Sequence, residues 1–132
     1  MKQVLILAVA LAGCTASAES QRSQAAEADR DLAKATEGRV AGKPQDCIPI
    51  NRAGGPQIID KQTLVYTDMG TVYVNRLPAA CPTLDRNDTI ISEVYGGNLC
   101  RNDRFRSLQP GTSIPGAYCQ LGSFTPYRKA KD

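Results

Sequence analysis

The hydrophobic positions of the chain fall into two separate stretches. Residues 4–12 (VLILAVALA) are apolar without interruption, whereas from Asp46 onward short β-branched and aromatic runs alternate with Gly, Pro and Asn breaks. Residues 15–43, between these stretches, are polar and show no apolar stripe at helical spacing. The pattern predicts a leader, a tether and one folded domain.

The leader is too short to be a stable membrane span. As a helix, residues 4–12 would be about 14 Å long, roughly half the thickness of a bilayer's hydrocarbon core. A basic start at Lys2, a short apolar run and the small residues Ala12 and Gly13 are instead typical of a secretory signal peptide.

The end of this leader, Leu11-Ala12-Gly13-Cys14, resembles the lipobox of bacterial lipoproteins. The resemblance implies removal of residues 1–13 as a signal peptide and acylation of Cys14, which would then anchor the protein to a membrane. Thr15 stands where an Asp often retains members of this class in the inner membrane. The resemblance therefore implies an outer-membrane anchor with the protein facing the periplasm. The alternative is an ordinary leader that is cut nearby and leaves Cys14 unmodified.

Residues 14–45 are predicted to form a lipidated tether that is disordered or partly helical. Their Ala and Glu residues favour a helix, and Gly38 is a suitable helix stop. Without an apolar stripe, such a helix has little surface to bury. The alternative is a helix that folds on contact with a partner.

Residues 46–127 are predicted to form a mainly β domain, a small antiparallel sheet or partly closed barrel, followed by a flexible tail at residues 128–132. The turn signals are Gly54-Gly55-Pro56, Asp68-Met69-Gly70, Gly96-Gly97-Asn98 and Gln109-Pro110-Gly111. The expected strands are Cys47–Asn51, Gln57–Ile59, Thr63–Tyr66, Thr71–Leu77, Thr89–Tyr95, Arg104–Leu108 and Ala117–Leu121. The clearest hairpin is Tyr95-Gly96-Gly97-Asn98.

The remaining cysteines predict two disulfide bonds. Cys47, Cys81, Cys100 and Cys119 form an even set in a chain that carries an export leader. Four cysteines allow three pairings; we expect Cys81 to pair with Cys100 and Cys47 with Cys119, the second bond tying the two ends of the domain. A zinc site is disfavoured, because there is no CxxC spacing and no histidine.

This domain also resembles a family of small proteobacterial envelope proteins. The resemblance covers roughly residues 46 to 127, implies a compact, disulfide-bonded β domain, and supplies no catalytic residues. It rests on Cys47-Ile48, Val74-Asn75-Arg76-Leu77, Cys81-Pro82-x-Leu84, Leu99-Cys100-Arg101-Asn102-Asp103 and Cys119-x-Leu121-Gly122-x-Phe124.

Arg101, Asp103 and Arg104 form the sharpest polar cluster and are the candidate ligand-binding residues. Two guanidinium groups beside a disulfide are suited to an anionic ligand. The competing interpretation places these residues in a turn and on a solvated strand face. Alternation along Arg104-Phe105-Arg106 predicts both arginines on one face and Phe105 on the other.

Composition argues against several function classes. The chain has 132 residues, a net charge of +3 spread along its length and no histidine. A weak, dispersed charge disfavours nucleic-acid binding, and the lack of histidine removes the usual general base and the commonest metal ligand. Asp85 and Asp88 are candidates for holding a hard cation, but two carboxylates make a poor calcium site. We expect no enzyme activity, no metal and no cofactor.

The function predicted from the sequence is that of a membrane-anchored periplasmic lipoprotein. Its expected role is binding or accessory, directed at an envelope protein or a cell-wall component. One alternative is an inhibitor of a cell-wall-degrading enzyme such as lysozyme. The other is a hydrolase of envelope glycans that works with two carboxylates.

Overall fold

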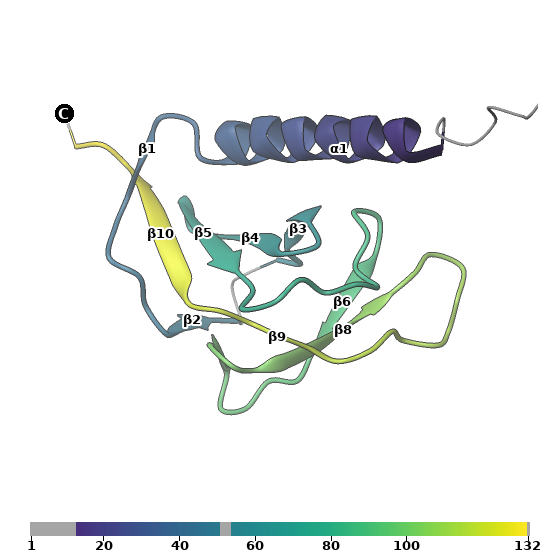
Figure 1. Ribbon diagram of the computed structural model, residues 1–132. Helices are drawn as coiled ribbons and strands as arrows, with labels where there is room; N and C mark the ends of the chain where they lie inside the picture. Colours follow the sequence, from purple (N-terminus) through teal and green to yellow (C-terminus); the bar gives the residue numbers. More distant parts are fainter. Residues whose placement is uncertain (1–12, 51–53, 132) are drawn as a thin grey trace, which may run out of the picture.

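The protein is mainly β (Figure 1). In the described residues, one long helix precedes ten short strands along the sequence. The computed structural model describes residues 13–50 and 54–131, and for residues 13–16 the backbone only. The elements are α1 (Gly13–Ala35), β1 (Arg39–Ala41), β2 (Cys47–Pro49), β3 (Gln57–Asp60), β4 (Thr63–Asp68), β5 (Thr71–Arg76), β6 (Thr89–Ser92), β7 (Asn98–Cys100), β8 (Arg104–Leu108), β9 (Cys119–Gln120) and β10 (Phe124–Lys129).

The described strands form three antiparallel sheets. The largest has the order β1-β10-β5-β4-β3, and the smaller ones are β2-β7 and β6-β8-β9. In Figure 1, α1 lies along one side of the five-stranded sheet and the small sheets lie on the other. The predicted mainly β fold of small antiparallel sheets is confirmed, and the sheets do not close into a barrel.

The central strands of the large sheet are buried on both faces. Side chains alternate along a strand, so one set of residues faces each side of the sheet. Leu64, Tyr66 and Tyr73 pack into the core between the large sheet and the small ones. Val65 and Val74 belong to a second, smaller cluster beneath α1. This arrangement explains why the centre of each strand is an uninterrupted apolar run, residues 64–66 in β4 and residues 72–74 in β5.

The Tyr95–Asn98 hairpin predicted from the sequence is present. Tyr95 and Asn98 form an antiparallel bridge, and the two glycines between them have φ angles of 72° and 79°. Two successive positive φ values match the right-handed twist of a two-residue hairpin, and glycine adopts them without steric cost.

Residues 14–45 are partly helical, which is one of the two states predicted for the tether, but the helix packs on the β domain. The backbone is helical through Ala35, and Ala28, Leu32 and Ala35 pack against the five-stranded sheet. Their spacing of four and three residues forms a helical stripe, but two of the three members are alanines, which hide it in the sequence. β1 then adds an edge strand beside β10.

The carboxyl-terminal boundary also differs from the prediction. β10 continues to Lys129, so the first two residues of the expected tail 128–132 pair with β1. The paired strand Arg39–Ala41 supplies the backbone partners that make this extension favourable.

The expected disulfide pairing is wrong. Cys47 is bonded to Cys100 and Cys81 to Cys119, with Cα–Cα distances of 4.0 Å and 5.8 Å. The reason is β7, which was not among the strands predicted from the sequence. β7 pairs with β2 and places Cys100 directly opposite Cys47.

Candidate functional site

The proposed anchor residue lies at the start of α1. The helix begins at Gly13, so the backbone of Cys14 is in its first turn, while its side chain lies outside the described residues. Residues 1–12 of the expected signal peptide also lie outside them. Within the described part of the chain, no helix is both long and apolar enough to cross a membrane.

Arg101, Asp103 and Arg104 do not converge on one pocket. Asp103 Oδ2 accepts a hydrogen bond from the Cys100 backbone N–H at 2.7 Å and so closes the turn between β7 and β8. Arg101 Nε lies 3.8 Å from Asp46 Oδ1, and Arg104 donates to Glu93 Oε2 at 3.0 Å. The three side chains therefore have different partners.

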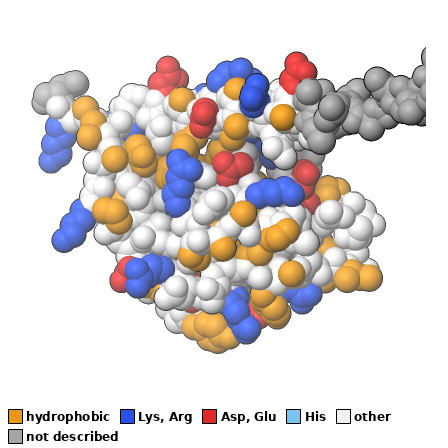
Figure 2. All heavy atoms as spheres, in the orientation of Figure 1, with side chains coloured by type: hydrophobic (Ala, Val, Ile, Leu, Met, Phe, Trp, Pro, Cys, Tyr) orange, Lys and Arg blue, Asp and Glu red, His pale blue; other side chains and the backbone are white. Residues whose placement is uncertain are grey.

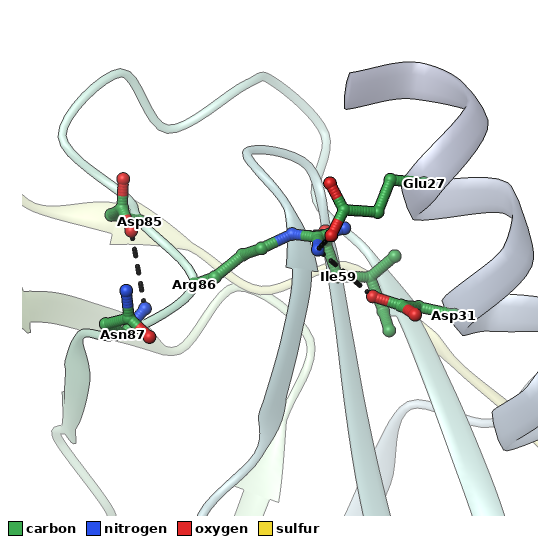
Figure 3. Close-up of polar contacts among 6 residues, drawn as sticks. All are labelled: Glu27, Asp31, Ile59, Asp85, Arg86 and Asn87. Carbon is green, nitrogen blue, oxygen red and sulfur yellow. Dashed lines mark hydrogen bonds and ion pairs between the residues drawn. The ribbon is translucent and has the colours of Figure 1, made fainter. Parts of the chain in front are cut away.

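Asp85 and Asp88 stabilise a turn with their carboxylates. Asp88 Oδ2 accepts from the Asp85 N–H at 2.9 Å, and Asp85 Oδ1 accepts from the Asn87 N–H at 3.4 Å. The second contact is drawn in Figure 3. Among the described residues, no group of three or more His, Cys, Asp or Glu side chains is placed to hold a metal ion.

Arg86, which the sequence predicted only as part of a polar surface loop, fastens α1 to the domain (Figure 3). Its Nη1 lies 2.7 Å from Glu27 Oε1 and 3.1 Å from Asp31 Oδ2, and its Nε donates to the Ile59 carbonyl at 3.1 Å. Glu27 and Asp31 are four residues apart, so they lie on one side of the helix. Sequence spacing reveals that pair but not the arginine that joins it to the domain.

The outer face of the β6-β8-β9 sheet carries the most distinctive surface chemistry. The guanidinium carbons of Arg104 and Arg106 lie 4.6 Å and 4.9 Å from the ring centre of Tyr118. Phe105 between the two arginines is fully buried, so the predicted alternation along β8 is confirmed. Ile91 on β6 lies opposite Arg106 in the register and is 42% exposed. We call Ile91, Arg104, Arg106 and Tyr118 the arginine–tyrosine face.

A hollow lies next to this face. It has a volume of about 320 Å³ and is lined by small and apolar side chains together with Arg104, Tyr118 and Gln120. The small and apolar lining residues include Pro78, Ala79, Ala80 and Pro82. In Figure 2, hydrophobic and basic side chains lie next to one another at the lower edge of the molecule, which in Figure 1 is formed by the segment between β6 and β8.

Burial alters the acidity of one phenol in the core. Tyr66 is 3% exposed, and this burial raises the pKa of its hydroxyl well above the ordinary value. The nearby Ser92 side chain acts in the opposite direction and is the smaller effect. This phenol is therefore held in its neutral form.

Comparison with known proteins gives no relative: no family model, no curated protein and no solved structure matches the chain.

Proposed function

We propose that the chain is a lipoprotein of the bacterial envelope, anchored to the outer membrane through acylated Cys14, with its β domain in the periplasm as a binding or accessory protein. The observation that carries this proposal is the pair of disulfides in a chain that begins with a lipobox-like leader. Structural disulfides persist in oxidising compartments such as the periplasm and are rare in the cytosol.

The position of α1 is consistent with anchoring at its amino end. The helix runs from Gly13 to Ala35 and is attached to the sheet at Ala28, Leu32 and Ala35. A helix of this length measures about 35 Å. The lipid and the domain would thus be joined by a helical arm rather than by a coil.

A binding role is supported by the surface chemistry of the domain. Tyr and Arg, together with Trp, are enriched among the energetically important contacts of protein interfaces. The arginine–tyrosine face presents both types, and Tyr118 is 50% exposed. The other polar clusters close turns or form ion pairs within the domain.

Metabolic labelling with an alkyne fatty acid tests the anchor directly. The wild-type chain is expected to carry label and to fractionate with outer membranes, whereas Cys14→Ser is expected to lose the label, because acylation requires the thiol. Thr15→Ala, which keeps the thiol, is the matched control. Equal labelling of the wild type and Cys14→Ser, or a wild-type chain found in the cytosol with its leader attached, would refute the proposal.

Sorting is tested by Thr15→Asp. In the lipoprotein class that the leader resembles, an Asp at this position retains the protein in the inner membrane. The labelled variant is expected to move to inner-membrane fractions. An unchanged distribution would count against the outer-membrane assignment and would leave the acylation of Cys14 standing.

A further inference from the structure

The arginine–tyrosine face has an uneven balance of charge. Glu93 pairs with Arg104, whereas no carboxylate in residues 13–50 or 54–131 forms an ion pair with Arg106. Arg106 instead donates from Nε to the Gly116 carbonyl at 2.7 Å and from Nη2 to the Pro115 carbonyl at 3.1 Å. These contacts orient the guanidinium through backbone oxygens, which carry no formal charge.

The same contacts make the face rigid. Arg106 is held by two backbone carbonyls, and Tyr118 directly precedes Cys119, which is bonded to the fully buried Cys81. Side chains that are ordered before binding lose less conformational entropy when a partner docks. The face is thus organised in advance for contact.

Glu93 shows how a carboxylate can bind at the arginine–tyrosine face. Its Oε2 lies 3.0 Å from Arg104 Nη2, and its side chain is 32% exposed. A guanidinium presents five N–H donors in a planar fork that matches a carboxylate. The bonds of Arg106 to Pro115 and Gly116 use two of its five donors, and the residue as a whole remains partly exposed.

We propose that the arginine–tyrosine face is the docking surface for an acidic segment of a protein partner, in which carboxylates are interleaved with apolar side chains. The carboxylates would bind Arg106 and compete with Glu93 for Arg104. The apolar side chains would cover Ile91, the Tyr118 ring and the apolar part of the adjoining hollow, which is formed by Pro78, Ala79, Ala80 and Pro82. This need for apolar contact favours a protein over a uniformly polar polyanion. The inference rests on the proposed function only in placing the partner in the envelope.

The first test measures binding of a short fluorescent peptide in which glutamate alternates with leucine. The full chain, purified in neutral detergent, is titrated at low salt and followed by anisotropy. Arg106→Gln is expected to weaken binding about tenfold, since it removes a charge-assisted contact. Arg22→Gln, which removes the same charge from an exposed position on α1, is expected to change it less than twofold. Equal effects of the two variants, or no binding by the wild type, would overturn the proposal.

The second test changes the affinity in the opposite direction and does not depend on the folding of the Arg106 variant. Glu93→Gln removes the internal competitor for Arg104 and is expected to strengthen peptide binding severalfold. Glu19→Gln makes the same charge change at an exposed helix position and is expected to have little effect. An affinity that is unchanged or weaker in Glu93→Gln would contradict the mechanism.

Competition identifies the class of ligand. Unlabelled peptide is expected to displace the probe at lower concentration than oligogalacturonate or phosphatidylglycerol added to the micelles. Stronger displacement by the glycan or the lipid would assign the face to that ligand and overturn the proposal. These measurements do not use the acyl group, so failure of the labelling experiment on Cys14 would leave their outcome intact.

Discussion

Asn75 and Gly122 show how single residues fix the junction between the layers. Asn75 is fully buried; its Nδ2 donates to the Gly122 carbonyl at 2.8 Å and its Oδ1 accepts from the Gly122 N–H at 2.8 Å. The amide side chain thus satisfies both backbone groups of a residue that lies between β9 and β10. Buried backbone groups that lack such partners are costly.

Gly122 is expected to tolerate no side chain. A Cβ at this position would lie 1.9 Å from the Arg76 carbonyl oxygen, and backbone cannot yield as a flexible side chain can. Gly122→Ala is expected to lower the free energy of unfolding in urea by about 3 kcal/mol or more. Gly54→Ala, where a Cβ meets nothing within 4 Å, should change it by less than about 0.5 kcal/mol. Similar losses in both variants would contradict this account.

Because the Tyr66 phenol is buried, the protein is expected to lose stability at alkaline pH. Its folded-state pKa is raised by burial, so the phenol ionises first in the unfolded chain. The stabilisation is therefore complete below the unfolded pKa of about 10 and declines as the pH rises above it. Urea unfolding measured across this range should show that decline in the wild type and a smaller one in Tyr66→Phe. Tyr95→Phe, on an exposed tyrosine, is the control and should retain the wild-type decline.

At the scale of elements, the sequence predicted those strands whose own residues and adjacent turns carry a clear signal. The β4–β5 region and the Tyr95–Asn98 hairpin follow from β-branched runs and glycine pairs. β1, β7 and β10 did not follow, because they depend on distant partners and β10 contains Pro126, which argues against a strand. The incorrect disulfide pairing was a direct result of missing β7.

The packing of α1 on the sheet was not predicted from the sequence for the same reason. Its stripe of Ala28, Leu32 and Ala35 is narrow, and the Arg86 contacts join segments far apart in the sequence. In the candidate site, the alternation of Arg104 and Arg106 was predictable from strand geometry. The contact of both with Tyr118 was not, because it depends on the placement of β9 beside β8.

Arg86→Gln is expected to loosen α1 without unfolding the domain. Its ion pairs are partly exposed, with side-chain exposures of 33% for Arg86 and 54% for Glu27, so the loss of global stability should stay near or below about 1 kcal/mol. Hydrogen exchange of the α1 amides should become severalfold faster, while that of the β4 and β5 amides stays close to wild type. Arg22→Gln is the charge-matched control. Unchanged exchange in α1 would show that its apolar stripe alone holds the helix.

At the scale of the whole molecule, the disulfides reinforce the layer of small sheets. Cys47–Cys100 joins β2 to β7, and Cys81–Cys119 ties the segment after β5 to β9. They span 53 and 38 residues, for which the loop-entropy model gives about 4 kcal/mol each. The five-stranded sheet relies on its hydrogen bonds and on its two buried faces, one of which is covered by α1.

Paired serine substitutions test this connectivity. Cys47→Ser with Cys100→Ser should leave Cys81 and Cys119 bonded to each other, with no free thiol among the domain cysteines. The mismatched pair Cys47→Ser with Cys119→Ser should expose two free thiols, because each substitution breaks a different bond. Thiol titration under denaturing, non-reducing conditions distinguishes the cases. The reverse pattern of free thiols would contradict the pairing.

The pairing of β1 with β10 governs when the fold can be completed. Residues 39–41 find their partners only at residues 127–129, and β10 must enter between β1 and β5 before either contact forms. Pairings this distant in sequence are slow to form, because the intervening chain must first be ordered. During synthesis, the earliest strand therefore waits for the arrival of β10, and the five-stranded sheet stays incomplete until most of the described sequence has emerged.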